Sequence, residues 1–247
     1  MIEIKDWDSH FFGFKVAEYR QTDFDGEVLK SAIDSAKDEE VCLLVYTTPA
    51  HTQFLCDEVT VLADRRHIFE FDLEASDLKK LASGPESIEI YESSESNDRL
   101  EALAIIAGGH SRFFTDPNFP EQAAIALYKM WMRASLAKDM ADVVFVTRDK
   151  EGEIAGIGAG RIDADGIGVP TLMAVDKKMT GQGLGRSFVL SCMSWLKQRG
   201  VKTARITTQS KNKLACNCYK RMGWQLVDRQ DIHHIWLKPP TIKAQYL

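Results

Sequence analysis

The chain has 247 residues and a formal net charge of −5, with 45% hydrophobic and 27% charged residues. These values are typical of a soluble globular protein, and they exclude disordered, fibrous and membrane-spanning chains. The length permits one large domain or two small ones without disulfides or a structural metal. A mild acidic excess without a block dense in Lys or Arg argues against nucleic acid or an anionic membrane as the main partner. We therefore expect a small-molecule partner.

The cysteines and the start of the chain indicate the compartment. There are five cysteines, an odd number without a C-x-x-C pair, so we expect free thiols and no metal site. The first residues include Glu3 and Asp6 where a signal peptide would carry basic residues, and no apolar run approaches the ~20 residues of a membrane span. The sequence predicts a cytoplasmic protein.

The first third of the chain is expected to form a smaller N-terminal α/β domain. Hydrophobic periodicity predicts a helix over 26–37 and strands over 41–46 and 68–73, and the aromatic cluster at 7–14 is expected to pack this domain. Between Ser76 and Ser96 the composition shifts to Ser, Glu, Gly and Pro. We place a boundary near residue 85, which gives domains of residues 1–85 and 86–247.

The second domain is expected to contain an antiparallel meander. Two turn signals, 149–152 and 163–166, separate three runs of β-branched or small residues. Helices and further strands flank the meander, so the predicted class is α+β with a mixed, largely antiparallel sheet flanked by helices. The expected elements are a strand at 88–91, helices at 98–107 and 121–137, strands at 143–147, 154–162 and 169–175, a helix up to Gly200, a strand at 203–208, a helix at 212–222 and a strand at 232–237.

A glycine-rich turn, Gly181-Gln182-Gly183-Leu184-Gly185, connects a strand to a helix. Glycines let the backbone approach a ligand closely, and the N–H groups at a helix N-terminus favour a phosphate or pyrophosphate. A dinucleotide-binding turn would come early, after a first parallel strand, whereas this one follows a meander. A nucleotide-triphosphate loop would need a lysine where Arg186 stands. The third chemistry that uses such a turn is a cradle for the pyrophosphate of coenzyme A, and the surroundings agree with it. A glycine-rich turn between a strand and a helix is also common without a ligand, and this alternative stays open here.

The segment 172–185, LMAVDKKMTGQGLG, resembles the acyl-CoA-binding motif of the GNAT superfamily of N-acetyltransferases. In that motif a strand ending in Val is followed by [Gln/Arg]-x-x-Gly-x-[Gly/Ala], and this chain departs from it at the first position, where Thr180 stands. The resemblance implies a GNAT fold for residues 86–247, with acetyl-CoA as co-substrate. The residues that the resemblance assigns to acetyl-CoA are Met173, Ala174, Val175, Thr180, Gly181, Gln182, Gly183, Leu184, Gly185, Arg186 and Asn212.

Asn212 and Tyr219 also fall where the superfamily keeps a CoA-contacting Asn and a catalytic Tyr. Seven residues on a helix place them about 20° from one face and roughly 10 Å apart along the axis, so they can line one groove. We expect Leu214, Cys218 and Met222 to supply the packing face of this helix, which leaves Tyr219 free to point into a cleft.

Acetyl transfer needs a neutral amine, donors for the developing oxyanion and a proton for the departing thiolate. Tyr219 is the expected general acid. A phenol with a pKa of about 10 is a weaker acid than a thiol at about 8.5, and we hypothesise that Lys213, Lys220 and Arg221 lower the pKa of Tyr219. The resemblance implies a backbone oxyanion donor in the strand 172–175.

Pro170 fits a strand that has partly left its neighbour, or simply a strand start. We assign no general base, and we expect Asp116 and Asp176 to be solvated. His233 and His234 are expected to face opposite sides of a strand.

A closer resemblance, to the TDP-fucosamine acetyltransferases, extends over most of the chain. It implies acetylation of the 4-amino group of a TDP-4-amino-4,6-dideoxyhexose by direct attack, in cell-surface polysaccharide biosynthesis. The loop 109–114 suits such an acceptor, with Arg112 for the diphosphate and Ser111 and Phe113 beside it. The alternative is a surface loop whose phenylalanines pack into the core. The short matches are Ser9–Gly13, Ser111–Phe113, Tyr128–Trp131, Gly181–Gly185, Trp195, Arg199–Gly200, Thr208–Gln209 and Asn212–Tyr219.

Two alternatives stay open at this point. In one, a GNAT enzyme acetylates a protein N-terminus, a lysine or a small amine. In the other, a GNAT-like module binds CoA without turnover. The sequence decides neither the acyl-chain length nor the oligomeric state, for which a homodimer is one option.

Overall fold

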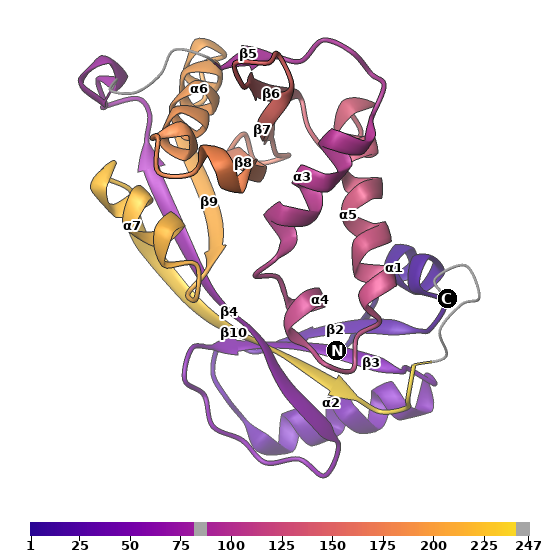
Figure 1. Ribbon diagram of the computed structural model, residues 1–247. Coiled ribbons are helices and arrows are strands. Elements are labelled where there is room, and N and C mark those ends of the chain that lie inside the picture. Colours follow the sequence, from indigo (N-terminus) through magenta and orange to yellow (C-terminus); the bar gives the residue numbers. More distant parts are fainter. Residues whose placement is uncertain (82–87, 241–247) are drawn as a thin grey trace.

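The computed structural model describes residues 1–81 and 88–240, and the boundary predicted near residue 85 lies outside them (Figure 1). Within the described residues one sheet has the strand order β1-β2-β3-β10-β4-β9-β8-β7-β6-β5. Among the described strands, the pairs β2–β3 and β8–β9 are parallel and the others are antiparallel. The predicted α+β class with a mixed, largely antiparallel sheet flanked by helices is therefore confirmed.

The predicted elements are largely present, with longer strands than expected. The strands are β1 (Glu3–Ile4), β2 (Val16–Arg20), β3 (Leu43–Pro49), β4 (Val59–Asp72), β5 (Glu89–Ile90), β6 (Val143–Arg148), β7 (Ile154–Ile162), β8 (Gly168–Val175), β9 (Thr203–Gln209) and β10 (Gln225–Trp236). The helices are α1 (Asp6–Phe12), α2 (Gly26–Asp38), α3 (Asp98–Gly108), α4 (Arg112–Thr115), α5 (Glu121–Leu136), α6 (Leu184–Gln198) and α7 (Lys213–Arg221), with the 3-10 turns η1 (Leu78–Leu81) and η2 (Lys177–Met179).

Strand β4 links the two halves of the chain. It comes from the N-terminal third, yet it pairs antiparallel with β9 on one side and with β10 on the other. In Figure 1 the long strands β4 and β10 run together from the half that contains α6 and α7 to the half that contains α2. Residues before and after the predicted boundary therefore share one sheet, and the division into two domains stays a prediction.

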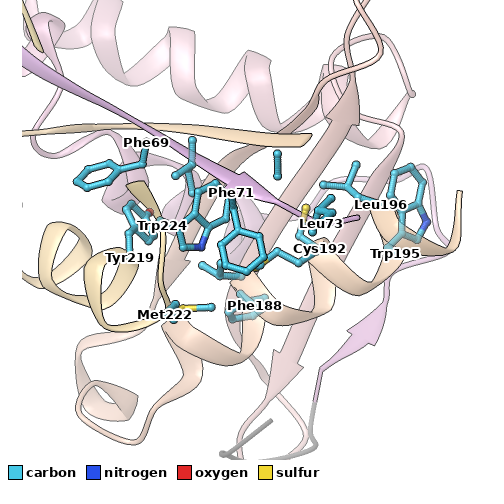
Figure 2. Close-up of a cluster of buried hydrophobic side chains, with 14 of the residues drawn as sticks. Phe69, Phe71, Leu73, Phe188, Cys192, Trp195, Leu196, Tyr219, Met222 and Trp224 are labelled. Atoms are coloured by element: carbon cyan, nitrogen blue, oxygen red, sulfur yellow. The ribbon is translucent and has the colours of Figure 1, made fainter. Parts of the chain in front are cut away.

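Helices cover both faces of the sheet. Helices α6 and α7 pack on a buried cluster that includes Phe69 and Phe71 of β4 and Leu73 directly after it, shown in Figure 2. On the opposite face, α3 and α5 pack on those side chains of the meander β6–β7–β8 that point away from α6, such as Ile157. The meander itself is antiparallel, as predicted from its turn signals.

Strand β7 is rich in glycine because α6 lies directly against it. A Cβ on Gly158 would lie 2.8 Å from Cδ1 of Phe188, and one on Gly160 would lie 2.5 Å from Sγ of Cys192. Real side chains would have to shift at such distances. These alternate glycines thus let α6 approach the sheet and fix where its N-terminus lies.

Candidate active site

The sheet opens between β8 and β9. Within the described residues these parallel strands are bridged only at Gly168 and Ala204, so the part of β8 from Thr171 to Val175 has no strand partner on its β9 side. A register shift in β7 between Gly158 and Gly160 adds a bulge in β8 near Leu172. Pro170 lies where the separation begins, as a residue without an N–H can. Because β8 still pairs with β7 on its other side, only alternate backbone N–H groups of residues 172–175 face the opening, where they are available as donors.

A cavity of about 360 Å³ occupies this opening. It is formed by β8 and β9 together with helices from both faces of the sheet. Asn212 and Tyr219 line it together, as their helical spacing predicted, and Leu172 and Met173 line it from the separated strand. The remaining lining residues are Ala107, Tyr128, Trp131, Ser135, Met140, Arg161, Val169, Pro170, Thr171, Thr207, Thr208 and Gln209.

Asn212 has a structural role that the sequence interpretation missed. It is the N-cap of α7, and its Oδ1 accepts a hydrogen bond of 3.2 Å from the backbone N–H of Ala215. An Asn directly before an amphipathic helix is a recognisable capping signal. This bond fixes the Asn212 side chain at the edge of the cavity.

Tyr219 is both a core residue and a wall of the cavity. It is 6% exposed, and its ring packs edge-on against Phe69 at a centroid distance of 5.7 Å and at a tilt against Trp224 at 6.0 Å (Figure 2). The predicted packing face of α7 is wrong in part, because Leu214 is 84% exposed while Cys216 and Tyr219 are buried. An i, i+3 stripe, rather than an i, i+4 stripe, contacts the sheet.

Burial decides the acidity of Tyr219. Desolvation raises the pKa of its phenol well above the ordinary value, and the neighbouring Lys213, Lys220 and Arg221 do not reverse this. The hypothesis of a lowered pKa is therefore wrong. The hydroxyl stays protonated throughout the neutral and moderately alkaline range.

The glycine-rich turn has the geometry of an anion cradle. Gly181 and Gly183 have φ angles of 82° and 83°, a left-handed conformation that favours glycine. Gly183 is the N-cap of α6 and offers no side-chain acceptor, so the first-turn amides have no intrahelical acceptor and no side-chain cap. Residues 180–183 are exposed, and nothing lies within 4 Å of a Cβ built on Gly181 or Gly185. These residues fit a diphosphate.

Three side chains at the cradle make contacts within the protein. The hydroxyl of Thr180 donates to the carbonyl oxygen of Lys177 at 2.8 Å, and Arg186 donates from its Nη2 to the carbonyl oxygen of Leu81 at 2.9 Å. The amide of Gln182 contacts the sulfur of Met179 at 3.7 Å. In this arrangement the backbone, rather than these side chains, presents donors to solvent.

The side chains of residues 173–175 point to both faces of the sheet. Met173 and Val175 pack against the buried cluster beneath α6, and Met173 also lines the cavity. Ala174 is buried on the opposite face, against α3. Of these three residues, Met173 is the one that lines the cavity.

The predicted acceptor residues of the loop 109–114 lie behind the cavity wall. Phe113 is 5% exposed and packs edge-on against Trp131 at 6.0 Å. Arg112 lies over the ring of Phe113 at 4.3 Å, and Ser111 is buried. None of the three is among the cavity-lining residues that the structure describes, whereas Tyr128 and Trp131 of α5 are.

A buried polar chain connects Arg112 to the sheet. Nη1 of Arg112 donates to Nε2 of His234 at 3.0 Å, and Nδ1 of His234 donates to Asp116 at 2.6 Å. Because an arginine can only donate, His234 is neutral, and burial lowers the pKa of its imidazole to about 4. Asp116 also accepts from Nε1 of Trp236 at 2.8 Å. His233 faces the other side of β10, as predicted.

The expectation that Asp116 and Asp176 are solvated is wrong. Asp116 is 3% exposed, because three hydrogen-bonded partners replace its water. Asp176 accepts from the backbone N–H of Lys178 at 2.8 Å and from Arg99 at 2.5 Å. Both carboxylates are therefore structural anchors in this protein.

In residues 1–81 and 88–240 there is no cluster of three or more His, Cys, Asp or Glu side chains suited to a metal ion. No described helix combines the length and apolar character needed to cross a membrane.

Comparison with known proteins identifies the fold of this chain. Residues 110–224 match the sequence model of the Acetyltransferase (GNAT) family. The crystal structure of a GCN5-related N-acetyltransferase from Sphaerobacter thermophilus superposes with a TM-score of 0.61 at 14% identity, over 98% of this chain and 78% of that one. The chain has the fold of the GNAT acetyltransferases.

Two curated relatives with sequence similarity to this GNAT-fold chain carry more specific names. The mycothiol acetyltransferase of Thermobifida fusca is 29% identical over 126 residues, which are 47% of this chain and 38% of that protein. The spore coat polysaccharide biosynthesis protein SpsD of Bacillus subtilis is 27% identical over 126 residues, 51% of this chain and 43% of that protein. The chain thus spans less than half the length of these relatives.

Proposed function

We propose that this chain is an acetyl-CoA-dependent N-acetyltransferase whose acceptor is the 4-amino group of a TDP-4-amino-4,6-dideoxyhexose. The observation that carries the proposal is the cavity between β8 and β9, which Asn212 and Tyr219 line on one side and the separated strand at Leu172 and Met173 lines on the other. The name of the Bacillus subtilis relative supports a sugar acceptor.

Acetyl-CoA supplies the thioester that the acceptor amine attacks. In the proposed mechanism the amides of residues 182–185 bind the diphosphate, and a backbone N–H of residues 172–175 donates to the developing oxyanion. A C–N bond forms, the C–S bond breaks, and Tyr219 gives its proton to the departing sulfur. The proton released by the amine passes to water, since no carboxylate or imidazole lines the described cavity wall.

The raised pKa of Tyr219 is compatible with this role. A buried phenol is a weaker acid than a free one, but the apolar surroundings that disfavour tyrosinate also disfavour a thiolate in the same cavity. The difference in pKa between the Tyr219 phenol and the CoA thiol is therefore smaller than the raised pKa of the phenol alone suggests. The raised pKa also keeps the phenol protonated at neutral and moderately alkaline pH, where the acceptor amine becomes neutral.

Release of free thiol from acetyl-CoA, followed with a TDP-aminosugar as acceptor, tests this function. We expect Tyr219→Phe to lower kcat by roughly 10²-fold or more, within the usual range for losing a general acid. Tyr19→Phe is the matched control, because Tyr19 is also buried but stacks on Tyr46 outside the cavity. Equal rates in the two variants would remove Tyr219 from the mechanism.

The pH profile provides a second readout. Because Tyr219 must be protonated to act and burial raises its pKa, activity should rise with pH as the acceptor amine loses its proton. No alkaline fall attributable to this phenol is expected below about pH 10, the unperturbed tyrosine value. A fall centred between pH 8 and 9 that Tyr219→Phe abolishes would contradict the assignment.

A small-molecule amine is the second candidate acceptor, favoured by the name of the Thermobifida fusca relative. Competition separates the candidates: TDP should inhibit the proposed reaction, whereas peptides and free small amines should not. Binding of CoA without thiol release for any amine would instead favour a non-catalytic module and overturn the proposed function.

A further inference from the structure

Arg161 is a cation at the cavity that the sequence interpretation did not select. It lies near the end of β7, where Gly156, Gly158 and Gly160 face α6. Side chains alternate along a strand, so Arg161 extends to the opposite face, on the side of α3 and α5. It is exposed and lines the cavity.

Arg161 also has no recorded partner within the described residues, unlike the arginines of neighbouring elements. Arg99 binds Asp176, Arg133 binds Glu101, and Arg148 binds Glu89. The nearby carboxylate of Asp142 accepts instead from the backbone N–H of Ile162, the residue after Arg161. The guanidinium of Arg161 is thus available to an anion that enters the cavity from solvent.

Trp131 forms a rigid apolar wall of the same cavity. Its ring is half-buried on α5 and packs edge-on against Tyr128 at 4.9 Å and against Phe113 at 6.0 Å. These two contacts fix the orientation of the indole. The apolar wall, Trp131, therefore comes from α5 and the cation, Arg161, from β7. Both elements lie on one side of the sheet opening.

The size of the cavity indicates what reaches Arg161. A volume of about 360 Å³ is near the lower limit of small-molecule sites. It can hold a sugar ring beside a thioester, but not a whole nucleotide-sugar. The charged part of such an acceptor must then lie at the mouth, where an exposed arginine can bind it without the cost of burying the charge.

We propose that Arg161 binds the diphosphate of the nucleotide-sugar and that Trp131 contacts the sugar ring next to it. This assignment rests on the proposed function for the identity of the acceptor. Arginine suits a diphosphate because its planar guanidinium donates two parallel hydrogen bonds to phosphate oxygens. The apolar face of a pyranose suits an indole wall. Arg161 and Trp131 are then the residues that select a phosphorylated acceptor over a free amine.

Calorimetric titration of the full chain with TDP tests Arg161 without requiring turnover. We expect Arg161→Gln to weaken TDP binding roughly 10- to 100-fold, as expected for losing charge-assisted hydrogen bonds. Lys150→Gln is the matched control, since Lys150 is an exposed cation in the turn before β7 and does not line the cavity. It should leave TDP binding unchanged, and both variants should bind CoA like the wild type.

Kinetics separate the two contacts. Arg161→Gln should raise KM for a TDP-aminosugar by a similar factor with kcat within about twofold, because the diphosphate contact is the same in the ground and transition states. Acetylation of the free aminosugar should not respond to Arg161→Gln. Trp131→Leu should raise KM for the TDP-aminosugar more than it weakens binding of TDP alone, since TDP lacks the sugar.

The outcomes distinguish this inference from the function on which it rests. If Arg161→Gln binds TDP as tightly as the wild type, the diphosphate subsite is overturned while acetyl transfer stands. If the wild type does not bind TDP at all but releases thiol with another amine, both the subsite and the nucleotide-sugar acceptor are overturned. If TDP binding depends on Arg161 but no amine yields thiol, the subsite is upheld and the proposed activity falls.

Discussion

Gly183 and Gly152 offer a matched test of the anion cradle at the residue scale. Both have left-handed backbone angles, with φ of 83° and 86°, but Gly183 begins α6 while Gly152 lies in the turn before β7. An alanine in this conformation costs roughly 1 kcal/mol at either position. We expect Gly183→Ala and Gly152→Ala to lower the free energy of unfolding about equally, measured by urea denaturation.

Only Gly183→Ala should weaken CoA binding, by about tenfold or more, because its Cβ enters the space where the backbone approaches a diphosphate. Calorimetry with CoA on both variants provides the comparison. If the two variants bind CoA with the same affinity, the turn 181–185 is not the diphosphate site.

His234 should make the stability of the protein depend on pH. Its pKa is lowered by burial from 6.5 to about 4, so between these values the unfolded chain binds a proton that the folded chain does not. Stability is then fully present above pH 6.5 and is lost as the pH falls. From pH 7 to pH 5 the loss from this group is about 2 kcal/mol.

A glutamine at this position tests the assignment, since it can accept from Arg112 and donate to Asp116 but cannot titrate. The free energy of unfolding of His234→Gln should fall less between pH 7 and pH 5 than that of the wild type. His110→Gln, the same substitution at an exposed histidine, should retain the wild-type pH dependence. An unchanged slope in His234→Gln would show that this imidazole is not the titrating group.

At the scale of elements, the contact between α6 and β7 positions the cradle. Gly158 faces the ring of Phe188 so closely that even one methyl group requires a shift. We expect Gly158→Ala to destabilise the fold by about 1–3 kcal/mol, the usual cost of overpacking a core. It should also weaken CoA binding, because α6 carries the first-turn amides.

A second substitution tests whether steric overlap with Phe188 causes the loss of stability in Gly158→Ala. In Gly158→Ala with Phe188→Leu, the smaller side chain makes room for the methyl group, so the two effects on the free energy of unfolding should be less than additive. Strict additivity in urea denaturation would indicate that the methyl group does not contact Phe188.

Local sequence patterns predict some of these strands and miss part of another. The three meander strands follow from β-branched alternation and two turn signals, and the structure has them within one residue of the predicted bounds. Strand β4 was expected only from residue 68, because the charged run Asp64-Arg65-Arg66-His67 hides a strand whose partners lie far away in sequence. Propensity does not encode that pairing.

The same distinction holds for the site. Asn212 and Tyr219 are seven residues apart on one helix, so a local spacing rule places both at one groove. Trp131 and Arg161 come from α5 and β7, and only the tertiary structure brings them to the wall of one cavity. Arg112 and Phe113 combine a cation with an aromatic ring, which suggests a ligand site from sequence, yet burial against His234 and Trp131 engages both.

At the scale of the whole molecule, β4 makes the two halves of the chain dependent on each other. Phe69 and Phe71 of β4 belong to the buried cluster that contains Tyr219, and Phe69 directly contacts the Tyr219 ring. Removal of β4 would leave facing edges of β9 and β10 without partners and expose this cluster. Unpaired edges and exposed apolar side chains both favour aggregation.

We therefore expect residues 86–247 expressed alone to lack a cooperative thermal transition, because each large side chain lost from the cluster removes about 1.5–3 kcal/mol of burial free energy. Co-expression of residues 1–85 with residues 86–247 should restore both the transition and thiol release, since β4 can insert between β9 and β10 without a covalent connection at residue 85. Circular dichroism on heating and the thiol assay measure the two properties. Residues 86–247 that melt cooperatively and release thiol without the N-terminal segment would show that β4 is dispensable to the fold and the site.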